Sequence, residues 1–233
     1  MDRVLAVSLC LCLALLAGCA HRYPKPGANE YLDYMAAQAK ADSVVVIQSK
    51  PSELLQTSAD QGFAPAQFEL AKQLRSAALQ DASNRASLNA KSCDLLKRAA
   101  ASDLLIAALS VRTQCADASL TGSLEEMLKA ADDGYAVLTK VAARQDPYGA
   151  FYPIKALEPV NCVESPSTED GAVQPPMLTL AQARAEALYT FAMREAKRAP
   201  AVAKQLGETA FSTGCSAKAY AQLLKMIAPQ AAQ

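Results

Sequence analysis

The chain has 233 residues, with 23 basic and 23 acidic side chains and a formal net charge of zero. The chain therefore lacks the excess of basic residues that is typical of nucleic-acid-binding proteins, and no nucleic-acid partner is expected. Hydrophobic residues make up 52% of the chain, tryptophan is absent and alanine is frequent. Such a composition favours closely packed helices over strands.

The first 18 residues predict an export signal. Arg3 precedes an apolar run from Val4 to Leu15, which is too short to span a membrane as a helix and ends in small residues. Leu16-Ala17-Gly18-Cys19 resembles the lipobox of bacterial lipoproteins, in which cleavage leaves the cysteine as a lipid-modified N-terminus. The resemblance implies a palmitate-bearing lipoprotein anchored at Cys19. The alternative is an ordinary signal peptide that is cleaved at another small residue nearby.

Residues 19–28 predict a lipidated N-terminus and a flexible tether, because two prolines and a glycine disfavour a helix there. The resemblance also implies a location, since Ala20 rather than aspartate follows Cys19. This pattern is that of lipoproteins sorted to the outer membrane, where the domain would face the periplasm and work close to the membrane. His21, the only histidine, lies in this tether and is interpreted as a solvated linker residue.

Four cysteines remain in the mature domain. Export places them in an oxidising compartment, where an even number favours disulfides, and four cysteines allow three connectivities. We favour one pair that joins two antiparallel helices and one that holds a long loop. A zinc site is the rival, but the chain has no Cys-x-x-Cys and only one histidine, so no metal or other cofactor is expected. The favoured pairs are Cys93 with Cys115 and Cys162 with Cys215.

Residues 29–145 predict a repeat-like helical region. We expect helices from Asn29 to about Asp42, from Pro51 to about Asp60, and from Pro65 onward. The apolar quartet Val44–Ile47 fits either a short strand or a helix.

The turn at Gly62 carries a family resemblance. Residues 58–71 resemble the SEL-one-like tetratricopeptide repeats, in which a turn of the form Ala-x-x-Gly-x-x-x-Ala-Gln-x-x-Leu joins two antiparallel helices. Glycine permits a left-handed helix stop, and small residues let the helices touch. The resemblance implies stacked helical hairpins. Its matching positions are Ala59, Gly62, Ala66, Gln67 and Leu70.

Two further segments suggest degenerate copies of this unit. In the first, Ala100 aligns with Ala59 but Asp103 replaces the glycine. The second places Ala131 and Gly134 at the alanine and glycine positions. Their spacing brackets the period of helical-hairpin repeats without keeping one value.

Residues 146–178 predict a long proline-rich loop, of a length that is uncommon inside a compact domain. Its first part carries Tyr148, Phe151 and Tyr152, which we expect to pack rather than to bind a partner. Residues 179–233 predict C-terminal helices that pack on the same domain. Thr179 and Gln182 form a capping box for a helix to about Arg198, which Pro200 should stop, and helices over 201–213 and 216–227 follow. The fold class is therefore all-α: a short tetratricopeptide-like array or a compact helical domain with one long loop.

The sequence contains no recognisable catalytic apparatus. It has no glycine-rich nucleotide loop, no Gly-x-Ser-x-Gly, no Ser-x-x-Lys and no histidine in the folded part. Neighbouring carboxylates are the remaining candidates, and we interpret them as solvated faces or helix starts. These are Glu125 with Glu126, Asp132 with Asp133, and Glu164 with Glu169 and Asp170.

The combined features predict a non-catalytic, membrane-anchored scaffold or adaptor of the bacterial envelope that binds a protein partner. Two alternatives stay open. Some SEL-one-like lipoproteins are immunity proteins that neutralise secreted toxins or lipases, and a carboxylate-based cell-wall hydrolase would need two carboxylates in one cleft.

Replacing Cys19 tests the lipid anchor. In cells fed radioactive palmitate, Cys19→Ser should leave the precursor uncleaved at that site and unlabelled. Cys12→Ser, which removes a thiol from the apolar run, is the control and should keep both cleavage and label. Labelling of the Cys19→Ser chain would contradict the lipobox interpretation.

Overall fold

A computed structural model describes residues 25–41, 50–117 and 124–228, and shows an all-α fold. Nine helices and one two-stranded sheet lie in these ranges. None of the described helices is long and apolar enough to cross a membrane. Cys19, His21 and the quartet Val44–Ile47 lie outside the described residues.

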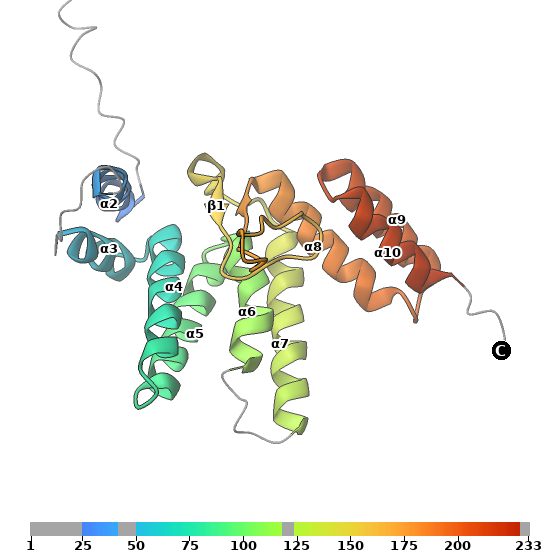
Figure 1. Ribbon diagram of the computed structural model, residues 1–233, viewed down its shortest axis with the longest axis horizontal. Coiled ribbons are helices and arrows are strands. Elements are labelled where there is room, and N and C mark those ends of the chain that lie inside the picture. The colour runs from blue at the N-terminus through green and yellow to red at the C-terminus, as the bar shows by residue number, and fades with distance from the viewer. Residues whose placement is uncertain (1–24, 42–49, 118–123, 229–233) are drawn as a thin grey trace, which may run out of the picture.

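The helices form a row of antiparallel hairpins from α2 at one end to α10 at the other (Figure 1). Sequence neighbours pack on each other: α2 on α3, α4 on α5, α6 on α7, and α8 on α9, with α10 against α9. The hairpins touch through α3–α4, α5–α6 and α6–α8 contacts. Their bounds are α2 Ala28–Ala41, α3 Lys50–Asp60, α4 Ala64–Gln80, α5 Arg85–Ala101, α6 Leu105–Asp117, α7 Leu124–Ala142, α8 Leu180–Glu195, α9 Pro200–Thr213 and α10 Ala217–Ile227.

The predicted turn at Gly62 connects α3 to α4. Gly62 has φ +85°, and its N–H and that of Phe63 donate to carbonyls three and five residues earlier. The other turn residues pack inside: Ala59, Ala66 and Gln67 are buried, Leu70 is half-buried, and Gln67 Nε2 donates to the Ala59 carbonyl at 3.2 Å.

The turn between α5 and α6 repeats this geometry without a glycine. Asp103 has φ +67°, and its N–H and that of Leu104 again bond carbonyls three and five residues earlier. Both turns therefore end a helix with the same pair of hydrogen bonds around a left-handed residue. Asp103, which the sequence aligns with Gly62, thus occupies the same position in a turn of the same geometry.

The third proposed repeat turn was wrong. Gly134 lies inside α7, not between two helices. It sits at a close approach of α7 to α6, because a Cβ built on Gly134 would lie 2.6 Å from Cα of Arg112. The contact between the two helices explains the glycine. In an alanine-rich sequence, a glycine at a helix contact has neighbours similar to those of a glycine at a turn.

Aromatic rings join the loop to the N-terminal hairpins. The ring of Phe63 contacts Tyr31, Tyr148 and Phe151 at centroid distances of 5.5, 5.6 and 4.9 Å. Lys25 lies in the described end of the predicted tether, and its Nζ is 3.8 Å from the centroid of the Tyr148 ring. The first part of the proline-rich loop therefore packs into the core, as expected.

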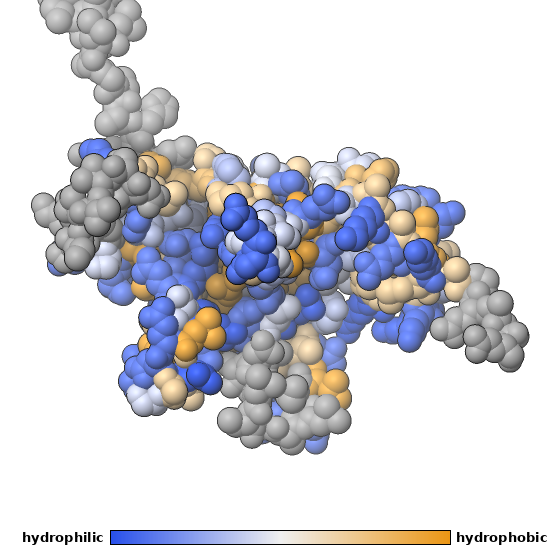
Figure 2. Space-filling view, viewed as in Figure 1, coloured by the Kyte–Doolittle hydropathy of each residue, from blue (hydrophilic) through white to orange (hydrophobic). Residues whose placement is uncertain are grey.

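The loop between α7 and α8 crosses the middle of the molecule in front of α6 and α8 (Figure 1). A 3-10 turn over Gly149–Phe151 precedes β1 (Ile154–Lys155), which pairs antiparallel with β2 (Met177–Leu178). This pairing brings the two ends of the loop together, so residues 156–176 form a closed excursion. The centre of this face is mostly hydrophilic (Figure 2).

Two disulfides are present, in the pairing that the sequence analysis favoured. Cys93–Cys115 joins α5 to α6 with a Cα–Cα distance of 5.3 Å. Cys162–Cys215 joins the loop to the α9–α10 turn with a Cα–Cα distance of 4.8 Å. Cross-links over 22 and 53 residues stabilise the fold by about 3 to 4 kcal/mol each in the chain-entropy description.

The helix after the loop begins as predicted and ends earlier. Thr179 and Gln182 form the capping box of α8. The helix ends at Glu195 rather than Arg198, and Pro200 occupies the first position of α9 instead of stopping α8. Proline is favoured there because its missing N–H would have no partner in a first helical turn.

Gly134→Ala tests the close contact of α6 and α7. Alanine gains up to about 1 kcal/mol of helix propensity, but overpacking against a backbone atom costs about 1–3 kcal/mol or more. We expect a net loss in the free energy of unfolding, measured by urea denaturation.

Gly149→Ala is the matched control for this substitution. A Cβ there would meet only the end of the Leu180 side chain, at 3.3 Å. It should therefore cost much less than Gly134→Ala. Equal stability of the two variants would contradict the close-contact explanation.

Candidate functional site

A buried carboxylate holds the start of the loop. Asp146 is 6% exposed and accepts three hydrogen bonds. Its oxygens accept from the N–H of Leu105 at 2.9 Å, the N–H of Tyr148 at 2.8 Å and the hydroxyl of Tyr152 at 2.9 Å. One side chain thus caps α6 and fixes the first turn of the loop.

A second buried carboxylate holds the middle of the loop. Glu186 of α8 is 3% exposed and accepts from the N–H groups of Asn161 and Cys162 at 3.2 and 2.7 Å. Burial raises the pKa of Glu186, while those two N–H groups and the charge of Arg112 act in the opposite direction. Burial is the largest effect, so the net direction is upward.

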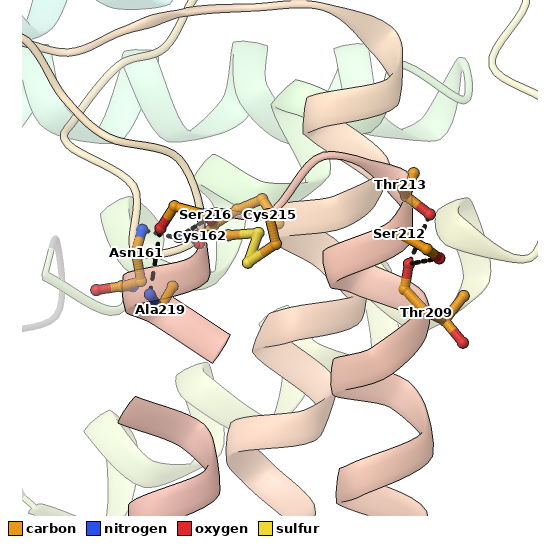
Figure 3. Close-up of a disulfide and its surroundings, with 9 residues drawn as sticks. Asn161, Cys162, Thr209, Ser212, Thr213, Cys215, Ser216 and Ala219 are labelled. Carbon is orange, nitrogen blue, oxygen red and sulfur yellow. Dashed lines mark hydrogen bonds between the residues drawn. A yellow bond between two sulfur atoms is a disulfide. The ribbon is translucent and has the colours of Figure 1, made fainter. Parts of the chain in front are cut away.

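The same segment is tied to the last hairpin (Figure 3). Beside the Cys162–Cys215 disulfide, the carbonyl of Cys162 accepts from the N–H of Ser216 at 2.7 Å. The hydroxyl of Ser216 then accepts from the N–H of Ala219 and caps α10. Residues 161–162 are therefore fixed on both sides, by α8 and by the start of α10.

A cavity of about 240 Å³, here called the loop cavity, lies between this fixed segment, α6 and α8. Aliphatic side chains form much of its wall, and polar side chains approach it from α6, the loop and α8. The aliphatic group includes Ile106, Leu109, Leu157, Val160 and Leu178, and the polar group includes Arg112, Thr113, Glu158, Asn161 and Glu186.

Two further cavities adjoin the loop cavity through shared residues. A cavity of about 150 Å³, here called the tyrosine cavity, contains Tyr135 and Tyr189 and shares Arg112 and Asn161 with it. A third, of about 510 Å³ between the loop and α10, also includes Asn161. The exposed Asn161 therefore stands where all three meet.

Arg112 separates the loop cavity from the tyrosine cavity. Its Nε is buried and has no hydrogen-bond acceptor among the described residues. Its guanidinium carbon lies 5.5 Å from the centroid of Tyr135, and that of Arg194 lies 4.3 Å from the same centroid. Arg194 is engaged by Asp132 at 3.1 Å. Arg112 and Ser165, whose buried hydroxyl lies beside the third cavity, are thus the side chains lining the three cavities that have a buried donor without an acceptor among the described residues.

Glu158 enters the loop cavity from the loop. Its carboxylate accepts from the hydroxyl of Thr113 and, at 2.6 Å, from Nε2 of Gln114. Both donors are neutral, and no cationic group within the described ranges lies within 4.0 Å of this half-buried carboxylate. A carboxylate has room for further donors, so Glu158 remains able to accept from a ligand.

The carboxylates that the sequence singled out lie outside the loop cavity, although Glu164 lines the third cavity. All of them are exposed, and none lines the loop cavity. The repeat-turn residues at Gly62 serve helix packing, and the Cys162–Cys215 disulfide adjoins the site, because the neighbouring residues Asn161 and Ser216 line the third cavity. Sequence reasoning missed Arg112, Glu158 and Glu186. The available signal was a charged residue on an otherwise small or apolar helix face, as Glu186 is between Ala183 and Ala187.

No family model, curated protein or solved structure matches this chain. The part of the chain that the structure describes holds no group of three or more side chains suited to binding a metal ion. The cavities around the loop, and the chemistry of the side chains that line them, are the features of this chain that bear on its function.

Glu186→Gln tests the buried carboxylate through pH. Because the folded pKa lies above the ordinary 4.5, the folded chain keeps this proton where the unfolded chain releases it. The stability from this group is thus full below about pH 4.5 and declines as the pH rises toward the folded pKa. The difference in unfolding free energy, wild type minus Glu186→Gln, should decrease as the pH rises above about 4.5.

Chemical denaturation at a series of pH values measures this difference. Glu164→Gln, which removes an exposed carboxylate from the same loop, controls for the loss of one charge. A difference for Glu186→Gln that rises with pH would contradict burial as the dominant effect.

Proposed function

We propose that this protein is a non-catalytic scaffold or adaptor of the bacterial envelope. In this proposal Cys19 carries the lipid anchor, the outer membrane holds the chain on its periplasmic side, and a protein partner binds around the loop. The observation that carries the binding proposal is the set of three adjoining cavities that meet at Asn161.

The construction of this site supports binding by a surface that is already formed. The loop is held by Asp146, Glu186 and the Cys162–Cys215 disulfide, so its cavities do not need to be assembled when a partner arrives. A preformed surface loses less conformational entropy on binding than a mobile one. The two disulfides also agree with an exported protein.

A carboxylate-based hydrolase is the second candidate, because Glu158 and Glu186 line the same cavity. Both side chains already accept hydrogen bonds on both oxygens, from Thr113 and Gln114 and from two backbone N–H groups. Although burial raises the pKa of Glu186, these bonds give both side chains a role in holding the loop in place, which favours binding over proton transfer to a substrate. We therefore favour binding.

Site-specific cross-linking in intact cells tests the proposal. With a photoreactive benzoylphenylalanine at Asn161, we expect one discrete cross-linked protein, identified by mass spectrometry. The same group at Lys204, an exposed residue of α9 outside the three cavities, is the control and should not capture it. Failure at Asn161, or equal capture from Lys204, would contradict binding at the loop.

Two further results then test the lipid anchor and the identity of the partner independently. Cys19→Ser in the same strain should reduce the cross-link, since the partner is proposed to lie at the membrane. The identity of the captured protein distinguishes an adaptor from an immunity protein, because only the latter would capture a secreted toxin or lipase.

A further inference from the structure

One edge of the loop carries main-chain groups that the fold leaves unbonded. Four residues of this edge neither donate nor accept a main-chain hydrogen bond with any other described residue. Main-chain N–H and C=O groups need partners, and an open row of them can pair with another chain. The four residues are Val163, Glu164, Ser165 and Ser167.

A small hairpin fixes the direction of this edge. Ser167 forms an antiparallel bridge with Val173, and the residues on either side of Ser167 make its two hydrogen bonds, at 2.9 and 2.8 Å. In such a pair the N–H and C=O of the bridged residue itself point away from the partner strand. Ser167 therefore presents one donor and one acceptor at the outer edge. Pro166, whose carbonyl accepts from Gln174, lies at an inner position, so its missing N–H leaves the outer edge complete.

Residues of this edge line the third cavity, of about 510 Å³. The opposite side of the cavity is formed by the start of α10, with Lys218 and Gln222. Both of these residues are exposed, as are Glu164 and Ser167 across from them, so a ligand can reach the cavity without rearrangement. Its volume lies within the range of ordinary ligand sites.

Both ends of the edge are held before a ligand arrives. At one end, the disulfide to Cys215 and the hydrogen bond from the N–H of Ser216 fix Cys162 against the start of α10 (Figure 3). At the other end, the bridge to Val173 holds Ser167. An edge that is already extended and fixed loses less conformational entropy on binding than a mobile segment.

The lining of the third cavity favours an uncharged, partly apolar ligand. Among the described residues that line it, Glu164 is the one acid and Lys218 the one base, so their charges balance. Neither an anion nor a cation is therefore selected. Three valines add apolar surface: Val160 and Val163 are half-buried, and Val173 is 53% exposed. A peptide main chain with aliphatic side chains matches both properties.

We propose that the third cavity binds an extended segment of the protein partner, which pairs with residues 163–167 as an added strand. The N–H and C=O of Ser167 bond one residue of that segment, and those of Ser165 bond the residue two positions along it. Its aliphatic side chains contact Val163 and Val173. This inference rests on the proposed function and specifies how the partner is held.

Hydrogen exchange on the full chain in detergent micelles tests this pairing. The probe is the uncharged peptide acetyl-Val-Thr-Val-Thr-Val-amide, whose β-branched residues favour an extended chain. At saturation, exchange of the N–H groups of Ser165 and Ser167 should slow by about fivefold or more, the effect of one added hydrogen bond. Exchange at Thr168, which already donates to Ala172, should change by less than about twofold.

A peptide N-methylated at its three central residues is the matched control probe. It keeps the side chains and loses N–H donors, so it should bind about fivefold more weakly or worse. Equal binding of the two peptides would overturn the inference.

Two substitutions at Ser167 separate the main chain from the side chain. Ser167→Pro removes an N–H that is unbonded within the described ranges, and affinity for the probe should fall by about fivefold or more. Ser167→Ala removes only the hydroxyl, so affinity should be unchanged. The N–H signal of Thr168 reports whether the hairpin persists in each variant.

Two further results would overturn the inference. These are unchanged exchange at Ser165 and Ser167 with excess probe, and loss of binding in the Ser167→Ala chain, which would assign recognition to the hydroxyl. Because the wild-type chain is compared with two peptides, the test does not depend on a variant folding. Cross-linking at Asn161 that persists while exchange at Ser167 is unchanged would reject this inference and keep the proposed function.

Discussion

The loop between α7 and α8 carries backbone N–H groups that no long helix or sheet satisfies, and two buried carboxylates accept from three of them, those of Tyr148, Asn161 and Cys162. Asp146 bonds the first turn of the loop and the start of α6, and Glu186 bonds its middle. A buried N–H without a partner is costly, so these two side chains decide where the loop can lie. The site depends on them because the loop forms one of its walls.

A loop held by polar contacts and a disulfide need not fill the space beneath it. Aromatic packing secures only its first part, where Tyr148 and Phe151 meet Phe63. Further along, Glu186 and Cys215 hold residues 161–162, and the space next to them is the loop cavity. Because the loop is held away from α6 and α8 at fixed points, space remains between them, which explains how this all-α domain keeps adjoining cavities.

The local features of the fold could be predicted from sequence, because their causes lie within a few residues. The capping box of Thr179 and Gln182 and the left-handed stop at Gly62 are of this kind. Gly134 failed as a turn because the cause of that glycine is Arg112, on the opposite helix. A single sequence does not distinguish a glycine that permits a close helix–helix contact from one that permits a positive φ.

The site was harder to predict than the fold for a similar reason. Nothing next to Glu186 in sequence reveals that its partners are N–H groups 24 and 25 residues away. Arg112 and Glu158 come from a helix and a loop that meet only in the folded chain. Two of the obvious carboxylate pairs are adjacent in α7 and therefore point to different sides of that helix, and the third group, Glu164 with Glu169 and Asp170, is exposed on the loop.

Because the Cys162–Cys215 disulfide holds one wall of the proposed site, the site is complete only after this disulfide has formed. It links a segment of the cavity wall to the C-terminal hairpin across 53 residues of sequence. In a reducing cytosol this covalent link would not form, and the wall beside Asn161 would rely on hydrogen bonds alone. For an exported chain, the newly made precursor would thus lack the finished site, and the binding surface would be completed only after export.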